Sequence, residues 1–223
     1  MIRFDTMEKA GLAVAAMSDK TDGNCGDANA RESFLERLDI RPEQLVRLRQ
    51  VHGVRVLDAD DVESNAATPP EADGIITTRR NIALGIGVAD CAPVLLYHPA
   101  PPAVAVLHAG REGTRHNIAA AGVRALCTIP EVHPAGLLAL VGPCAGACCY
   151  EVSEDMAADW TAAGLPTAGR HLDISGAICA QLEYAGVIRH NIRVVPHCTV
   201  CGGGFYSYRA DKTSDRNLVV VML

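Results

Sequence analysis

Residues 83–114 read ALGIGVADCAPVLLYHPAPPAVAVLHAGREGT, and two apolar runs in or beside this stretch each lead to a reactive side chain. The run 82–89 is followed closely by Cys91, and the run 103–107 is followed directly by His108. Short apolar runs bounded by Gly and Pro are typical of buried β-strands. The stretch therefore predicts neighbouring strands with a cysteine and a histidine at their ends.

A similar run upstream leads to another histidine. Residues 45–51 alternate in polarity, so that Val46, Leu48 and Gln50 share one strand face with His52. We expect a strand over 45–51 that ends at His52. If the fold brings three strand ends together, two imidazoles and one thiol meet there.

The composition favours a layered fold. Hydrophobic residues make up 49% of the 223 residues, but aromatic residues only 4%, so the core must consist of Ala, Val, Leu and Ile. Such side chains suit a sheet covered by helices. The length is that of one large domain, so we expect a single domain over residues 1–223.

Strands and helices are expected in irregular order. The expected strands are 12–17, 45–51, 75–78, 82–88, 94–97, 103–107, 137–141, 191–195 and 218–222. The expected helices are 28–38, 114–130, 154–163 and 174–184, the last with Asp173 as N-cap. Loops are expected at 18–27 and 58–73. This order predicts an α+β (mixed α/β) fold of mixed β-sheets covered by helices.

The net charge and the number of cysteines limit the binding partners and the cellular compartment. A net charge of −6 argues against a nucleic-acid partner and against binding to an anionic membrane. We find no signal peptide and no apolar run long enough for a membrane span, so a cytoplasmic location is expected. Nine cysteines, an odd number, indicate thiols or metal ligands in a reducing compartment.

His52, Cys91 and His108 have side chains that bind zinc or copper. Three protein ligands and one open position are typical of a catalytic zinc site. Their spacing forms no local metal motif, and a buried, hydrogen-bonded His or Cys is the plainer interpretation of each alone. From the residues themselves, the shared site is a hypothesis.

Several motifs resemble blocks of the YfiH/DUF152 family. They are QVHG at 50–53, ADCAPVLL at 89–96 and VLHAG at 106–110. Further matches in the same order are GP at 142–143, YEV at 150–152, HLDI at 171–174, CT at 198–199, SYR at 207–209 and DK at 211–212. The resemblance covers residues 45–212.

This resemblance implies a function. The family has been called laccase-domain (multicopper polyphenol oxidase) and peptidoglycan-editing factor, and it is associated with purine nucleoside phosphorylase, methylthioadenosine phosphorylase and adenosine deaminase activities. By resemblance, the chain is a single YfiH-like domain that acts on purine nucleosides and phosphate. His52, Cys91 and His108 would then be catalytic residues and the ligands of a zinc ion.

Other residues are candidates for contacts with substrate. Arg111 and Thr114 lie at an expected helix start, where backbone N–H groups attract phosphate, and Arg209 offers a second cation. Asn24 matches an Asn in the family's early loop. Asp90 is a candidate to hydrogen-bond one of the metal ligands and so to orient it. The plainer interpretations are a solvated helix start and, for Arg209, a structural ion pair.

One departure from the family concerns the helix start. The usual run is HAGWRGT, whereas this chain has Arg111 and Glu112 in place of Trp and Arg. If that family Arg binds phosphate, Glu112 would repel it. Arg111 would then have to replace the missing cation, or phosphorolysis would be weak.

Further cysteines suggest a second metal site. Cys144 and Cys148, together with Cys198 and Cys201, offer four thiolates for a structural zinc. Small buried residues are the plainer interpretation. The spacing does not decide between the two.

Three other functions remain open. In a metal-free cysteine hydrolase of the deamidase type, Cys91 would attack and His108 or His52 would act as base. A copper-dependent polyphenol oxidase (laccase) would need several coppers, and a non-enzymatic protein of cell-wall assembly would tolerate loss of all three ligands. The sequence indicates no particular protein partner.

Overall fold

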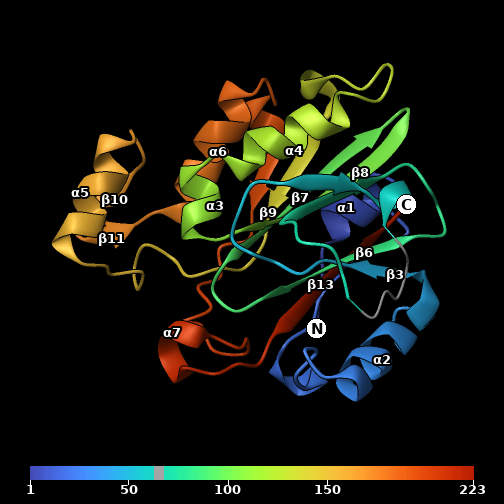
Figure 1. Ribbon diagram of the computed structural model, residues 1–223, viewed down its shortest axis with the longest axis horizontal. Coiled ribbons are helices and arrows are strands. Elements are labelled where there is room, and N and C mark those ends of the chain that lie inside the picture. Colours follow the sequence, from blue (N-terminus) through green and yellow to red (C-terminus); the bar gives the residue numbers. More distant parts are fainter. Residues whose placement is uncertain (63–67) are drawn as a thin grey trace.

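The computed structural model describes residues 1–62 and 68–223. In this part of the chain, two mixed β-sheets stack face to face, with helices on both outer sides. Figure 1 shows α4 (Ile118–Leu126) and α6 (Ile174–Tyr184) over one sheet and α2 (Ala28–Glu36) beneath the other. The structure confirms the predicted fold class, mixed sheets covered by helices.

The sheet under α4 and α6 has six strands within the described residues. In spatial order they are β12 (Ile192–Val194), β9 (Leu138–Val141), β7 (Ala92–Pro99), β8 (Pro102–Ala109), β5 (Gly74–Thr77) and β4 (Val56–Asp58). The two outer pairs are parallel, and the inner pairs are antiparallel. β7 and β8 form a hairpin whose register pairs Pro93 with His108. This register fixes where Cys91 lies relative to His108.

The second sheet has five strands in the same described part. In spatial order they are β1 (Ile2–Arg3), β2 (Val14–Met17), β13 (Asn217–Met222), β6 (Ala83–Val88) and β3 (Leu45–Arg47). The chain crosses from this sheet to the other between β6 and β7, through residues 89–91. Cys91 therefore lies at the junction of the two sheets.

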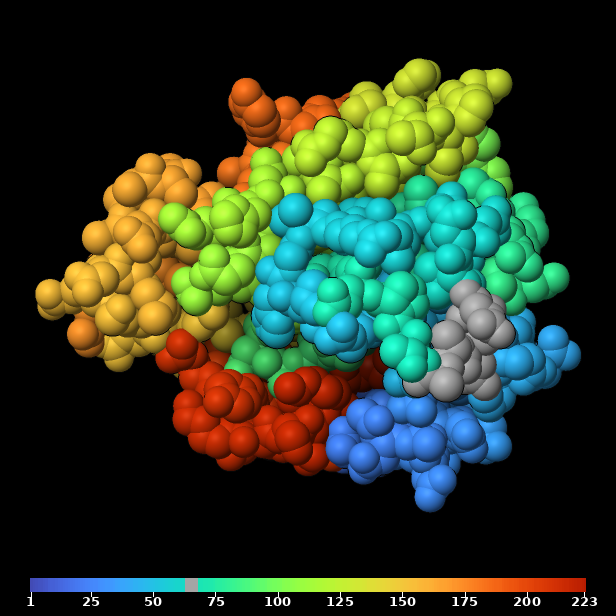
Figure 2. All heavy atoms as spheres, in the orientation of Figure 1, coloured from blue at the N-terminus to red at the C-terminus, as the bar shows by residue number. Residues whose placement is uncertain are grey.

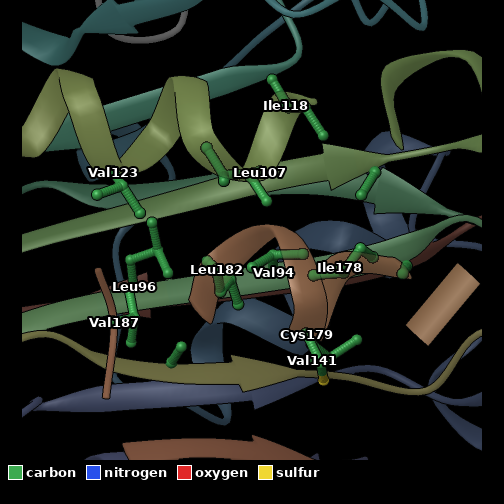
Figure 3. Packing of buried hydrophobic residues seen from close by; sticks show 14 of the residues in the cluster. Val94, Leu96, Leu107, Ile118, Val123, Val141, Ile178, Cys179, Leu182 and Val187 are labelled. Carbon is green, nitrogen blue, oxygen red and sulfur yellow. The ribbon is translucent and has the colours of Figure 1, made fainter. Parts of the chain in front are cut away.

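Buried side chains explain why the strands read as continuous apolar runs. On β7, Val94 and Leu96 pack toward α4 and α6, while Leu95 and Tyr97 pack toward the other sheet. Figure 3 shows Val94 and Leu96 among the side chains of the helix-covered core. A strand with both faces buried needs apolar residues at every position rather than at alternate ones.

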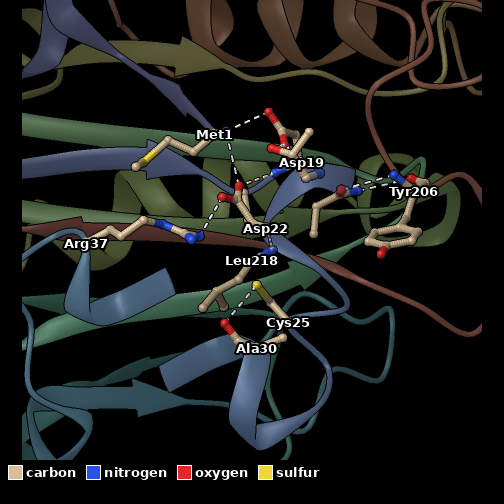
Figure 4. A network of polar contacts seen from close by, with 11 residues as sticks. Met1, Asp19, Asp22, Cys25, Ala30, Arg37, Tyr206 and Leu218 are labelled. Carbon is tan, nitrogen blue, oxygen red and sulfur yellow. Dashed lines mark hydrogen bonds and ion pairs between the residues drawn. The ribbon is translucent and has the colours of Figure 1, made fainter. Parts of the chain in front are cut away.

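The opposite face of the five-stranded sheet is covered by α2. Phe34 of α2 packs with Leu218 and Val220 of β13. Polar contacts also join the N-terminal segment to α2: the amino group of Met1 lies 3.1 Å from a carboxylate oxygen of Asp22, whose other oxygen binds Arg37 (Figure 4).

The remaining elements are short. They are α1 (Asp5–Lys9), α3 (Arg111–Arg115), α5 (Glu154–Ala162), α7 (Tyr208–Asp211), and a hairpin of β10 (Thr167–Ala168) and β11 (His171–Leu172). Short 3-10 turns cover Lys20–Asp22, Pro42–Gln44, Ala59–Asp61, Pro134–Gly136 and Arg189–Asn191. Among the described residues, no helix is both long and apolar enough to span a bilayer.

Two predicted elements were wrong in their extent. The strand expected over 45–51 ends at Arg47, so His52 lies in a loop instead of at a strand end. The helix expected over 114–130 is divided into α3 and α4, because Asn117 has a left-handed backbone and caps the second helix by accepting the N–H of Ala120. Asn tolerates this conformation better than most residues.

Other boundaries agree more closely. The helix expected over 174–184 is α6, and Asp173 caps it by accepting the N–H of Gly176 at 2.8 Å. The loop expected over 58–73 includes the end of β4 and a 3-10 turn, while its residues 63–67 lie outside the described part. The strands β1, β4, β10 and β11 were missed because runs of two or three residues carry no period.

Candidate metal centre and active site

The structure brings His52, Cys91 and His108 together. One ligand atom from each lies within 4.8 Å of the others. His108 is on β8, Cys91 precedes β7 of the same hairpin, and His52 reaches them from the loop after β3. Residues far apart in the sequence thus form one donor set of two imidazoles and one thiol.

A tight loop presents His52. Its backbone is left-handed, with φ of 60°, which is uncommon for a residue other than Gly. The buried carboxylate of Asp73 stabilises the loop by accepting the backbone N–H groups of Val51, His52 and Gly53 at 3.2, 2.9 and 2.7 Å. Three hydrogen bonds to one carboxylate offset the strain of this conformation.

Asp73 also orients the second histidine. Its Oδ1 lies 2.8 Å from Nδ1 of His108, and the side chain of Asp73 is fully buried. A carboxylate on one ring nitrogen fixes the tautomer and leaves the other nitrogen for a metal or a proton transfer. Hydrogen bonds from His108 and from the Gly53 backbone hold the pKa of Asp73 below its usual value, although burial opposes this.

The electrostatics favour charge separation between Cys91 and His108. Burial alone would raise the pKa of the Cys91 thiol, but hydrogen bonds from His108 and His52 outweigh it and lower this pKa to about 6. Burial would likewise lower the pKa of His108, yet hydrogen bonds to Asp73 and Cys91 raise it to about 9. Near neutral pH, without a metal, the pair is a thiolate and an imidazolium.

Gly110 keeps the site open. A Cβ at this position would lie 3.0 Å from Sγ of Cys91 and 3.0 Å from Cδ2 of His52. Any larger residue would therefore press on two of the three donor side chains. The glycine leaves space beside the donor set for a further small group.

A cavity of about 690 Å³ lies against the three donors. This volume is within the usual range for sites that bind small molecules. Its lining includes the cationic side chains of Arg111, Arg209 and Arg216 and the aromatic ring of Tyr150. In Figure 2 the surface is hollowed between the red C-terminal segment and the cyan and yellow-green segments above it.

Arg209 and Tyr150 form one wall of the cavity. The guanidinium carbon of Arg209 lies 4.5 Å from the centre of the Tyr150 ring, and its Nη1 donates to the carbonyl oxygen of Glu151 at 2.7 Å. The plainer interpretation of Arg209, a structural ion pair with Asp211 or another carboxylate, does not describe these contacts. A flat cation stacked on a ring offers a surface for another flat group.

Of the other residues predicted to contact substrate, one lines the cavity and two do not. Arg111 lines the cavity and pairs with Glu112 at 2.5 Å. Thr114 is fully buried, and Asn24 accepts the backbone N–H of Arg216 at 2.9 Å; neither is among the lining residues. Asn24 therefore positions the backbone of Arg216, a lining residue that carried no sequence signal.

The predicted role of Asp90 needs correction. Its carboxylate accepts the hydroxyl of Thr199 at 2.7 Å and the backbone N–H of Arg209 at 2.6 Å, so it holds two loops together. The carboxylate that contacts the donor set is that of Asp73, the last residue of the loop expected over 58–73. The signal for Asp73 in the sequence is an acidic residue directly before a strand that is buried at every position.

The predicted set of four further cysteines also needs correction. The four sulfurs within 4.8 Å of one another belong to Cys148, Cys149, Cys198 and Cys201. Cys144 is buried, and its backbone forms a bridge with that of Cys198. We refer to the first four residues as the cysteine cluster.

Comparison with known proteins places these features in context. The family model described as multi-copper polyphenol oxidoreductase laccase matches residues 15–223. The solved structure of YlmD from Geobacillus stearothermophilus is similar, with a TM-score of 0.85 and 28% identity, covering 94% of this chain and 91% of that one.

Two curated relatives carry names that state an activity. Purine nucleoside phosphorylase ORF3 of Streptomyces griseus is 36% identical over 197 residues, which are 83% of this chain and 77% of the relative. Adenosine deaminase RL5 from an unknown prokaryotic organism is 30% identical over 193 residues, covering 78% and 72%.

Proposed function

The chain belongs to the multi-copper polyphenol oxidoreductase laccase family, and we propose that it is a zinc-dependent purine nucleoside phosphorylase. The substrates would be adenosine- and inosine-type nucleosides, including methylthioadenosine, and phosphate. The observation that supports this best is the donor set of His52, Cys91 and His108 beside a cavity lined by arginines and Tyr150. The name of the Streptomyces griseus relative agrees with it.

The donor set fits zinc. Two imidazole nitrogens and a thiolate are common zinc ligands, and the space beside Gly110 suits the open fourth position of a catalytic site. When bound, zinc supplies Lewis-acid chemistry that makes water a nucleophile near neutral pH. Asp73 would keep His108 in the tautomer that a metal requires.

Copper, the metal in the family's description, fits less well. His52, Cys91 and His108 offer one mononuclear site. Transfer of electrons to O₂ in a multicopper oxidase uses several coppers, and among the described residues the other cluster of donors consists of sulfur alone. We therefore propose zinc as the metal at this site.

In phosphorolysis, a phosphate oxygen attacks the ribose carbon C1′ while the bond from C1′ to the base breaks. The chain's part is to hold the anion and the base in line. Arg111, Arg209 and Arg216 would bind phosphate, and Tyr150 with the stacked Arg209 would contact the purine. Glu112, paired with Arg111, would weaken the hold on phosphate.

Adenosine deamination is a second activity of the same site. Water would attack C6 of the purine, and ammonia would leave. The relative named adenosine deaminase supports it, as does a donor set suited to a metal that activates water. Deamination needs no phosphate, so it would not depend on Arg111.

One experiment tests both activities. Purified protein is incubated with adenosine, with and without phosphate, and the products are separated by chromatography. Adenine with ribose-1-phosphate, formed only with phosphate, marks a phosphorylase, and inosine marks a deaminase. Cys127→Ser, a cysteine outside both clusters, should behave as wild type. Absence of all these products from zinc-loaded protein would refute the proposal.

A metal-free cysteine hydrolase is the second candidate function. It is favoured by the relay of Cys91, His108 and Asp73, because a thiolate beside an oriented imidazolium is the arrangement of a cysteine nucleophile. Stoichiometric zinc that is lost in His52→Ala supports the phosphorylase. Inactivation by iodoacetamide of an active, metal-free protein supports the hydrolase.

We also propose that the protein acts in the cytoplasm. All nine cysteines lie in the described part of the chain and are free there, and the cysteine cluster holds four thiols close together without a disulfide. Such thiols persist in a reducing compartment.

A further inference from the structure

The cysteine cluster joins two loops that lie outside the regular sheets. Cys148 and Cys149 belong to the loop between β9 and α5, and Cys198 and Cys201 belong to the loop between β12 and α7. We propose that these four thiolates bind a second Zn²⁺ in a closed, structural site, in addition to the centre at His52, Cys91 and His108.

The spacing of the sulfurs suits a tetrahedral ion. Four sulfurs placed about 2.3 Å from a zinc ion at tetrahedral corners lie ~3.8 Å from one another. Sγ of Cys148 lies 3.7 Å from Sγ of Cys201, and all four sulfurs lie within 4.8 Å of one another. A disulfide would need about 2.05 Å between sulfurs, so the pair is unbonded.

The backbone around the cluster is shaped to receive sulfur. The N–H of Gly146 donates to Sγ of Cys198 at 3.3 Å, a contact that stabilises a thiolate over a thiol. A Cβ on Gly146 would lie 3.3 Å from Sγ of Cys148 and 3.5 Å from Sγ of Cys198. The glycine therefore lets the chain pass close beneath two of the sulfurs.

Backbone hydrogen bonds hold the two loops in place. The N–H of Thr199 donates to the carbonyl of Cys144 at 3.0 Å, which joins one loop to the other. The turn at the Cys198-x₂-Cys201 spacing is closed by the N–H of Gly202, which donates to the carbonyl of Cys198 at 2.8 Å. This spacing is typical of structural zinc sites. The donors are thus arranged before any ion binds.

The chemistry of the donors limits the ion to a soft metal. Four soft thiolates select zinc over magnesium or calcium, which prefer oxygen ligands. Cys148 and Cys201 are exposed, so an ion can enter from solvent, and the displaced thiol protons pass to water. Four sulfur ligands leave no position for a substrate, so the role is structural.

The cysteine cluster lies next to residues of the cavity, so a structural ion there would affect the cavity wall. Cys149 directly precedes Tyr150 in the cavity wall, and Thr199, next to Cys198, binds the carboxylate of Asp90 beside Cys91. An ion that ties the two loops would also fix Tyr150 and Asp90. Loss of the ion should loosen the cavity wall and leave the donors of the first site in place.

Metal analysis of the whole chain tests the proposal. Protein purified under reducing conditions should hold two zinc ions per chain by mass spectrometry of the metal. Cys201→Ser and Cys149→Ser should each lose one, and His52→Ala should lose the other. Cys144→Ser and Cys127→Ser, matched cysteines outside the cluster, should keep both. One zinc per chain, lost in His52→Ala but retained in Cys201→Ser, overturns the proposal.

Cobalt in place of zinc supplies a second readout if a variant folds poorly. Each thiolate adds a charge-transfer band in the near ultraviolet, so the wild-type protein should show bands of about five thiolates, four from the cluster and one from Cys91. His52→Ala should retain most of that absorbance. Absorbance equal to one thiolate, or disulfides among these four cysteines in reduced protein, also overturns the proposal.

Discussion

In the described part of the chain, the two clusters of His and Cys side chains differ in donors, setting and room. His52, Cys91 and His108 mix nitrogen and sulfur at the junction of two rigid sheets, and Gly110 leaves space beside them. The cysteine cluster has only sulfur donors, and both of its halves are on loops. A site with three donors and space can carry a reaction, whereas four donors with no space can only hold loops together.

Loss of a donor from the first site should have the largest effect. In Cys91→Ser and His108→Ala, we expect adenosine turnover to fall to the level without enzyme, because a site short of one ligand cannot hold its metal or its nucleophile. Steady-state kinetics and metal content measure this. Cys201→Ser should keep a substantial part of kcat, since the cysteine cluster does not touch the substrate. If Cys201→Ser lost as much activity as Cys91→Ser, the two sites would not differ in function.

Substitution of Asp73 should have the second-largest effect. Asp73→Asn removes the charge that orients His108 and holds the His52 loop, and changes of this kind cost about 10–100-fold in metal affinity or activity. Competition with a chelator measures the affinity for zinc. Asp159→Asn, an exposed position on α5, is the matched control. Wild-type affinity in folded Asp73→Asn would show that the carboxylate acts on the loop alone.

The pH dependence of thiol reactivity sharpens the comparison further. After metal removal, alkylation of Cys91 by iodoacetamide should rise as pH rises through about 6, because the thiolate forms there instead of near the ordinary value of 9.0. Buried Cys144, whose pKa is raised to about 12 by its burial, should not react. Peptide mass spectrometry at several pH values follows each cysteine.

His108 sets the pH at which half of Cys91 is thiolate, the half-point of this curve. His108→Ala removes the main hydrogen bond that lowers the pKa of Cys91, so the half-point should move upward toward 9.0. Zinc added before the reagent should protect Cys91 in the wild type. A half-point near 9.0 in the wild type itself would contradict the thiolate–imidazolium pair.

Much of the fold could be predicted from the sequence, because short apolar runs bounded by Gly and Pro favour buried strands over helices. The runs before Cys91 and His108 predicted the ends of β6 to within one residue and those of β8 to within two. The short strands were not legible, and the division of the helix at Asn117 depended on one residue's tolerance of a left-handed backbone.

The donor triplet was suggested by motif resemblance, but its partners were not. Asp73 binds His108 and the His52 loop only because β5 and β8 pair in the folded sheet, and no local pattern records that pairing. Likewise, spacing favoured Cys144 for the cysteine cluster, whereas the direction of the turn after Gly146 selects Cys149. Side-chain direction in loops depends on tertiary contacts.

Glu112 should give the smallest effect. Its carboxylate pairs with Arg111 at 2.5 Å at the cavity wall, so Glu112→Gln should free Arg111 for phosphate. Because an exposed ion pair is worth at most about 1 kcal/mol, KM for phosphate should fall by up to about fivefold. Glu183→Gln on α6, which breaks the surface ion pair between Glu183 and Arg189, is the matched control. Since deamination uses no phosphate, its KM for adenosine should not change. A shift in both activities would mean that Glu112 shapes the cavity as a whole, and an unchanged KM for phosphate would place the anion away from Arg111.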